Sequence, residues 1–182
     1  MLKERYIVSE PTSFQAQALP LLLEQRDCIA KASPGYGKTF GLVLASLLLT
    51  QQRKNQGGAH SKSTLLVHPT EAGAAALFRL ANSLARNLHR ANPDFLLEIA
   101  FAGASTSNED DQAFDVKVGT PEKLSAQTSQ TCFLLAVDGV ELITESQQAL
   151  VAGLMRNMDQ EGQKVLFGQR LPSRSLLDEF SR

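Results

Sequence analysis

The stretch ASPGYGKT, residues 32–39, decides how the rest of this sequence is interpreted. It ends in Gly37-Lys38-Thr39 and matches the phosphate-loop pattern Gly-x4-Gly-Lys-Ser/Thr, except that Ala32 stands at the first glycine. The apolar run DCIAKA (27–32) precedes it, and the helical pattern TFGLVLASLLL (39–49) follows it. Phosphate loops connect a strand to a helix in this order. We therefore predict a phosphate-binding loop, and disfavour a chance glycine turn because both flanks fit.

The residues of this loop have separate expected roles. Gly35 and Gly37 let the backbone bend so that amide groups point at phosphate oxygens, and the helix N-terminus adds a partial positive charge. Lys38 is expected to reach the outer phosphates, and the Thr39 hydroxyl is expected to ligate Mg²⁺. Tyr36 is bulky for its position, and we expect it to crowd the phosphates.

Apolar runs alternate with helical patterns along the rest of the chain. Several runs are apolar nearly throughout, as strands covered on both faces are. A helix is predicted over 74–89, with Leu77, Leu80, Leu84 and Leu88 on one face. This alternation predicts an α/β fold with a mostly parallel central sheet flanked by helices. The strands after the first are expected at 63–69, 95–102, 114–119, 132–138 and 163–168.

Polar segments separate these elements. QQRKNQGGAHSKS (51–63) is expected to be a solvated connection, and GASTSNEDDQ (103–112) a polar, acidic surface loop. The final segment LPSRSLLDEFSR (171–182) is expected to contain a short amphipathic helix.

The composition suits one domain of ordinary size. Of 182 residues, 43% are hydrophobic and 20% charged, and the net charge of −1 excludes a basic nucleic-acid coat protein and an acidic disordered tail. Cys28 and Cys132 lie far apart in apolar runs and are expected to be buried, reduced thiols. No signal peptide and no apolar run long enough to span a bilayer are found, so we expect an intracellular protein, cytoplasmic or nuclear, without a membrane partner.

The segment PTSFQAQALP (11–20), together with the phosphate loop, resembles the start of the DEAD-box RNA helicases. Pro11, Thr12, Gln15 and Pro20 match the family's pattern, and so does the distance to the loop. The resemblance implies a RecA-like P-loop domain that binds ATP or ADP with Mg²⁺. It also implies that Gln15 reads the adenine edge, because a carboxamide donates and accepts hydrogen bonds together. A polar residue on an N-terminal helix is the alternative for Gln15.

Three later segments resemble the parts of the family that hold the backbone of single-stranded RNA. They are HPTEAG (68–73), FAGAS (101–105) and VGTPEKL (118–124), in the family's order. Helix starts bind phosphates without an overall basic charge, although ordinary turn and capping chemistry explains each segment equally well. Glu122 replaces the family's glycine and adds a negative charge near the expected RNA path. The implied RNA-binding residues are Pro69, Thr70, Gly103, Thr120, Pro121 and Lys123.

The segment LLAVDGVELI (134–143) departs from the family's Asp-Glu-Ala-Asp. Asp138 matches the first position and is expected to hold Mg²⁺ through water, the alternative being a helix N-cap. Gly139 replaces the glutamate that polarises the attacking water, and the loss of a general base costs about 10²–10⁴-fold. Glu141 falls on the last acidic position and is expected to point elsewhere.

The segment VLFGQRLP (165–172) departs from the family again. Gly168, Gln169 and Arg170 stand where the family has Ser-Ala-Thr, which is bonded to the last acidic position and couples hydrolysis to strand separation. Both sides of this coupling have changed, while the nucleotide-gripping residues are nearly intact. The pattern is that of a nucleotide binder with little turnover.

The resemblance implies that residues 1–182 form the first of two RecA-like domains, with the second absent from this chain. The expected partners are single-stranded RNA, held weakly by this domain alone, the second RecA-like domain, and other proteins. Two alternatives stay open. One is an active ATP-dependent helicase domain in which Glu141 or another group is the base; the other is a protein-binding scaffold without either ligand.

Overall fold

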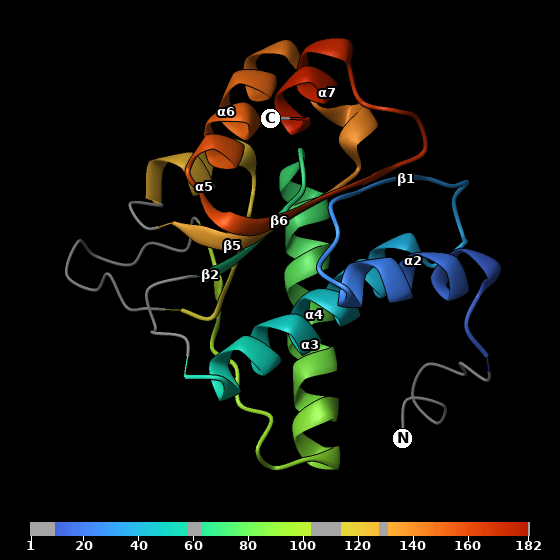
Figure 1. Cartoon of the computed structure of the whole chain (residues 1–182), viewed down its shortest axis with the longest axis vertical. Coiled ribbons are helices and arrows are strands. Elements are labelled where there is room, and N and C mark those ends of the chain that lie inside the picture. Colours follow the sequence, from blue (N-terminus) through green and yellow to red (C-terminus); the bar gives the residue numbers. More distant parts are fainter. Residues whose placement is uncertain (1–9, 58–62, 103–113, 128–130, 182) are drawn as a thin grey trace.

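A six-stranded sheet forms the centre of the protein, as seen in a computed structural model that describes residues 10–57, 63–102, 114–127 and 131–181 (Figure 1). Every pairing between the described strands is parallel, in the order β1-β6-β5-β2-β4-β3. The predicted fold class is therefore confirmed. The strands are β1 (Cys28–Lys31), β2 (Ser63–Val67), β3 (Ile99–Phe101), β4 (Val116–Gly119), β5 (Cys132–Asp138) and β6 (Met158–Gly168).

Helices cover both faces of the sheet. One layer contains α2 (Ser13–Leu23), α3 (Lys38–Asn55) and α4 (Glu71–Ala91); the other contains α5 (Pro121–Gln127), α6 (Glu145–Arg156) and α7 (Arg174–Phe180) (Figure 1). A 3₁₀ turn, η1 (Val140–Leu142), follows β5. Parallel strands need such crossover connections, and their helices bury both faces of the sheet.

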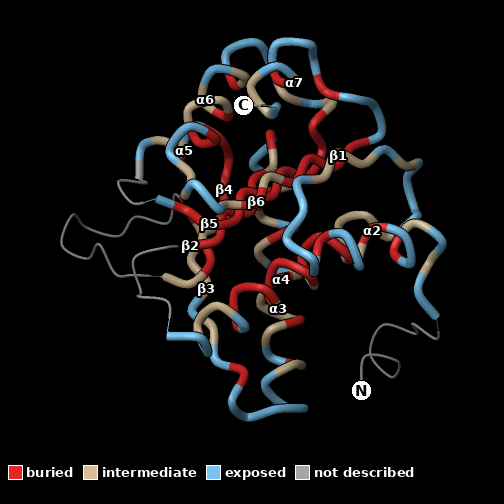
Figure 2. The backbone as a smooth tube through the Cα atoms, in the orientation of Figure 1, coloured by how far each residue is buried: buried red, intermediate tan, exposed pale blue. Residues whose placement is uncertain are grey.

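The core lies between the sheet and these two helical layers, where buried backbone concentrates (Figure 2). All seven residues of β5 are buried, as expected for a central strand with an apolar run. Neighbouring residues of a strand point to opposite faces. Accordingly, Leu134 and Ala136 pack toward α3 and α4, while Leu135 and Val137 pack toward α6. Phe167 is fully buried and meets Phe14 of α2 edge to face at 5.2 Å between ring centroids.

The bounds of several elements differ from the prediction. The segment 95–102 contains only the three-residue strand β3, while β6 begins five residues before the predicted 163–168. The helix predicted over 74–89 is the longer α4, which begins after Thr70, whose hydroxyl accepts a hydrogen bond from the Gly73 amide. The amphipathic helix near the C-terminus is confirmed as α7.

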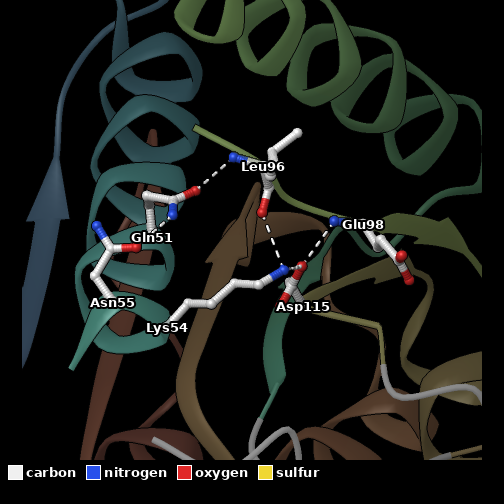
Figure 3. Close-up of polar contacts among 6 residues, drawn as sticks. All are labelled: Gln51, Lys54, Asn55, Leu96, Glu98 and Asp115. Carbon is white, nitrogen blue, oxygen red and sulfur yellow. Dashed lines mark hydrogen bonds and ion pairs between the residues drawn. The ribbon is translucent and has the colours of Figure 1, made fainter. Parts of the chain in front are cut away.

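The prediction of a solvated connection at 51–63 is wrong for its first five residues, which continue α3. Figure 3 shows the reason: polar side chains of this turn have partners on neighbouring segments. Gln51 accepts from the backbone N–H of Leu96, and Lys54 forms a 2.8 Å ion pair with Asp115. The Asp115 carboxylate also accepts from the N–H of Glu98. These contacts attach the end of α3 to the segments that flank β3 and β4.

The two cysteines are free, as predicted. Cys132 is buried, and desolvation raises the pKa of its thiol to about 12, although a backbone hydrogen bond opposes this shift. Cys28 is only half-buried; burial also raises its thiol pKa, with Arg26 opposing. No helix in the described ranges is long and apolar enough to cross a bilayer.

Candidate nucleotide site at the carboxyl edge of the sheet

The loops that follow β1, β2, β5 and β6 meet at the carboxyl edge of the sheet. They enclose a cavity of about 530 Å³. Ligands of open α/β sheets bind outside the carboxyl ends of the strands. A second cavity, of about 540 Å³, lies near β6, α6 and α7 and includes none of the motif residues, so we assign the site to the first. Its lining residues come from the motif segments and two helices: Pro34, Gly35, Gly37, Lys38, Thr39, Phe40, His68, Leu80, Asp138, Gly139 and Gln169.

The phosphate loop has the backbone that its glycines predict. Gly35 and Gly37 have φ angles of 84° and 74°, in the left-handed region that favours glycine. α3 begins directly after Gly37, so its first N–H groups face the loop. The Lys38 ammonium donates to the carbonyl oxygens of Ala32 (2.6 Å) and Ser33 (2.8 Å). The lysine is thus held over the loop, where phosphate oxygens would compete for its protons.

The predicted Mg²⁺ residues are in direct contact. The Thr39 hydroxyl donates to Oδ2 of Asp138 at 2.5 Å, although the two residues are 99 positions apart. Asp138 ends β5 and is only 7% exposed. A hydroxyl and one carboxylate fit Mg²⁺, which keeps several waters and takes further oxygens from phosphates. Within the described ranges, no three His, Cys, Asp or Glu side chains gather as a metal-binding group.

Gln15 lies beside the phosphate loop and connects it to α2. Its Oε1 accepts from the Thr12 amide at 3.1 Å and completes a capping box, while its Nε2 donates to the Gly37 carbonyl at 3.1 Å. The Thr12 hydroxyl donates to the Tyr36 carbonyl at 2.7 Å. The Thr-x-x-Gln spacing is a helix-start signal, so the start of α2 after Thr12 was readable in the sequence. The adenine-reading role of Gln15 stays a prediction.

Tyr36 does not narrow the site. The residue is 48% exposed and is not among those that line the cavity. The expectation that this ring crowds the phosphates finds no support in the shape of the cavity, and the place of Tyr36 beside a bound nucleotide stays a prediction.

The position after Asp138 has no side chain and a constrained backbone. Gly139 has a φ of 76°, and its N–H donates to the Phe167 carbonyl at 2.9 Å. The imidazole of His68 lies beside it: a Cβ built on Gly139 would be 3.1 Å from Nε2 of His68. No motif in the sequence predicted a role for His68.

The Glu141 side chain points to the turn after β6, whereas it was expected to point away from that segment. Its Oε2 accepts from the backbone N–H of Gln169 at 3.0 Å. The acidic residue after β5 therefore contacts the turn after β6, although Gly168, Gln169 and Arg170 replace the expected side chains. Because its carboxylate is engaged there, Glu141 is not among the residues that line the cavity.

The predicted RNA residues gather at the ends of β2 and β4. Pro69, Thr120 and Pro121 are buried, so their side chains shape the loops, whereas Thr70 is exposed and Lys123 half-exposed. Gln147 of α6 joins the two loops by donating to the Pro69 carbonyl and to Glu122 Oε1, both at 2.8 Å. Gly103 lies outside the described residues, as does the predicted acidic loop 103–112.

Lys123 on this surface is paired with an acidic residue. Lys123 Nζ lies 2.6 Å from Glu71 Oε1 and 5.8 Å from the centre of the Phe101 ring. Burial tends to raise the pKa of Glu122, but hydrogen bonds from its own backbone N–H, Gln147 and Thr120 outweigh this effect and hold that pKa below its ordinary value. Glu122 is therefore an ionised group near the loops that were expected to meet RNA.

A six-stranded parallel sheet with a Gly-Lys-Thr loop after its first strand defines a P-loop domain of the RecA-like class. The sequence model of the DEAD/DEAH box helicase family matches residues 12–169. The chain belongs to the DEAD/DEAH box helicase family.

Individual relatives are consistent with this assignment. The chain is 25% identical over 174 residues to the ATP-dependent RNA helicase CHR1 of Candida albicans, covering 90% of this chain and 30% of the relative. It is 29% identical over 124 residues to the ATP-dependent RNA helicase ROK1 of Kluyveromyces lactis, covering 64% of this chain and 20% of the relative. The chain thus spans less than a third of either relative.

Solved structures share the fold. S. cerevisiae Dbp5 bound to RNA and ADP BeF3 superposes with a TM-score of 0.77 at 17% identity, over 97% of this chain and 44% of that chain. A hypothetical ATP-dependent RNA helicase from Sulfolobus tokodaii superposes with a TM-score of 0.70 at 18% identity, over 98% and 51%.

Proposed function

We propose that this chain is an ATP- and RNA-binding first domain of a DEAD-box-like helicase with impaired hydrolysis. The observation that carries the proposal is the cavity wall. Lys38, Thr39 and Asp138 lie together on this wall and carry groups that suit phosphates and Mg²⁺, while position 139 has no side chain to polarise water. The site therefore has the groups for binding and lacks the expected group for turnover.

Each residue of the site has a defined task in this proposal. The loop N–H groups and Lys38 bind phosphate oxygens, and the start of α3 adds its partial positive charge. Thr39 and Asp138 would hold Mg²⁺, Asp138 through water. When bound, Mg²⁺ supplies charge compensation on the phosphates. Gln15 reads the adenine edge and braces the loop through the Gly37 carbonyl.

The proposed binding partners are those that the resemblance to the helicase family implies. A second RecA-like domain would complete the nucleotide site, and single-stranded RNA would bind over the loops after β2 and β4. A relative of the same fold is described as bound to RNA and ADP BeF3, which supports this assignment of ligands. Binding of other proteins through the same fold is the second candidate.

Calorimetric titration of the chain with Mg-ATP and with ADP tests the proposal. We expect weak, saturable binding of both nucleotides. Heat changes indistinguishable from buffer dilution for both would exclude a nucleotide site and favour the protein-binding scaffold.

The chain is expected to bind ATP more tightly than GTP, and Gln15→Ala should narrow the difference. A buried amide left without its base partner costs about 1–3 kcal/mol, so the wild-type preference should be of that size. Parallel titrations with ATP and GTP measure it. Because Gln15 also braces the loop, Thr12→Ala is the matched control: it removes the hydroxyl that holds Tyr36 but keeps the carboxamide, and should weaken both nucleotides alike. Equal wild-type affinities for ATP and GTP would remove Gln15 from base recognition.

Glu71→Gln is expected to strengthen binding of single-stranded RNA by up to about fivefold. The substitution removes the ion pair between Glu71 and Lys123 and leaves the Lys123 ammonium available to RNA phosphates. An exposed ion pair of this kind contributes at most about 1 kcal/mol, which sets the upper limit of the effect. Lys123→Ala should weaken binding and lower the salt slope by about 0.7, the value for one contact to a single strand. Fluorescence anisotropy at two salt concentrations measures both. An unchanged affinity and slope in Lys123→Ala would place the RNA path elsewhere.

A further inference from the structure

The imidazole of His68 occupies a space that two glycines leave open. His68 follows β2 at the carboxyl edge of the sheet and is part of the cavity wall. A Cβ on Gly73, in the first turn of α4, would be 2.0 Å from Nδ1 and Cε1 of the ring. A Cβ on Gly139 would be 3.1 Å from Nε2. The ring therefore lies against the backbone at both positions, and its Nε2 edge is the side near Gly139.

The hydrogen bonds of the ring assign its proton. Nδ1 of His68 lies 3.1 Å from the backbone N of Thr70, and this N–H can only donate, so Nδ1 is the acceptor. The Thr70 hydroxyl is 3.2 Å from the same nitrogen. A neutral imidazole with an accepting Nδ1 carries its proton on Nε2. In the part of the chain that the structure describes, no protein atom accepts a hydrogen bond from Nε2.

The ring thus places a hydrogen-bond donor on the wall of the nucleotide cavity. The same wall contains Lys38, Thr39 and Asp138, the residues assigned to phosphates and Mg²⁺. An N–H donor binds an anionic oxygen, whereas it cannot accept a proton from water. At the position beside Gly139, a donor would therefore favour an intact terminal phosphate and give no help to its hydrolysis.

We propose that His68 is a nucleotide-contacting residue that donates from Nε2 to the terminal phosphate and makes the site prefer a triphosphate over a diphosphate. This inference rests on the proposed nucleotide-binding function. It adds a residue that the family motifs do not identify, whose ring fits beside the backbone of Gly73 and Gly139.

The test compares two variants that separate the donor from the ring. His68→Phe fills a similar space between the glycines but has no donor, whereas His68→Gln loses the ring but keeps an amide donor. Each is titrated with Mg-ADP and with a non-hydrolysable Mg-ATP analogue. His89→Phe is the matched control, because His89 lies at the far end of α4, where its Nδ1 contacts the Phe95 carbonyl.

We expect His68→Phe to bind the ATP analogue about tenfold more weakly than wild type, since a hydrogen bond to a charged group contributes at least that much. ADP binding should change less than twofold. His68→Gln should keep most of the preference, and His89→Phe should match wild type. Unchanged ADP affinity also shows that a variant is folded around an intact loop.

Two results overturn the inference, and they differ from failure of the proposed function. If His68→Phe binds both nucleotides like wild type, or loses both equally, His68 does not contact the terminal phosphate. If the wild-type chain binds neither nucleotide, the proposed function fails and the inference fails with it. Wild-type binding of ADP distinguishes these cases before any variant is measured.

Discussion

Lys38→Ala is expected to abolish binding of adenine nucleotides by this domain. The ammonium is held over the phosphate loop by the carbonyl oxygens of Ala32 and Ser33, at the start of α3. Its removal takes away a charge-assisted contact of about 1.5–3 kcal/mol, which weakens binding roughly 10- to 150-fold. Because wild-type binding is expected to be weak, the remaining affinity should fall below detection in a calorimetric titration with Mg-ATP.

Lys31→Ala is the control for this experiment. Lys31 is exposed at the end of β1 and does not line the cavity, so its removal changes the net charge equally while leaving the loop intact. It should bind nucleotide within about twofold of wild type, because Lys31 is exposed and water and salt weaken the interactions of an exposed charge. Equal binding by wild type and Lys38→Ala would mean that the loop is only structural.

Hydrolysis of ATP is expected to be negligible, with or without single-stranded RNA, even when a second RecA-like domain is supplied. The expected cause lies in this domain, because Gly139 has no carboxylate to polarise the attacking water. The loss of a general base lowers the rate about 10²–10⁴-fold. Phosphate release measures the rate, with Lys38→Ala defining the background. Robust RNA-stimulated release that Lys38→Ala eliminates would contradict impaired hydrolysis. Glu141 would then be the next residue to mutate.

Gly139→Glu alone is expected to restore little of this activity. A non-glycine residue at a φ of 76° costs about 1–2 kcal/mol, and its Cβ would be close to the His68 ring. The double change with His68→Ala gives the new carboxylate room and should release more phosphate than either single change. Strand separation should recover later than hydrolysis, because the resemblance implies Ser-Ala-Thr where this chain has Gly168, Gln169 and Arg170.

The sheet and the backbone of the phosphate loop were predictable from local patterns. An apolar run such as the one that forms β5 indicates a strand buried on both faces, because helices cover a central strand above and below. The glycines of the phosphate loop indicated left-handed φ angles, which the structure has at Gly35 and Gly37. The order of the motifs indicated that Thr39 and Asp138 lie together, although they are 99 residues apart. The ends of the helices and strands were less predictable. The helix α3 continues to Asn55, where Lys54 forms an ion pair with Asp115, a residue 61 positions away.

Other contacts between separate loops depended on the order of the strands in the sheet. β5 lies between β2 and β6, so the residues after these three strands meet at one edge of the sheet. This places the His68 ring beside Gly139 and the Glu141 carboxylate on the Gln169 amide, and no spacing along the chain encodes either contact. A sequence motif predicts the local backbone conformation and the side chains that lie on it. Which loop faces which depends on the packing of the whole sheet, because only that packing brings residues from distant strands within hydrogen-bond distance.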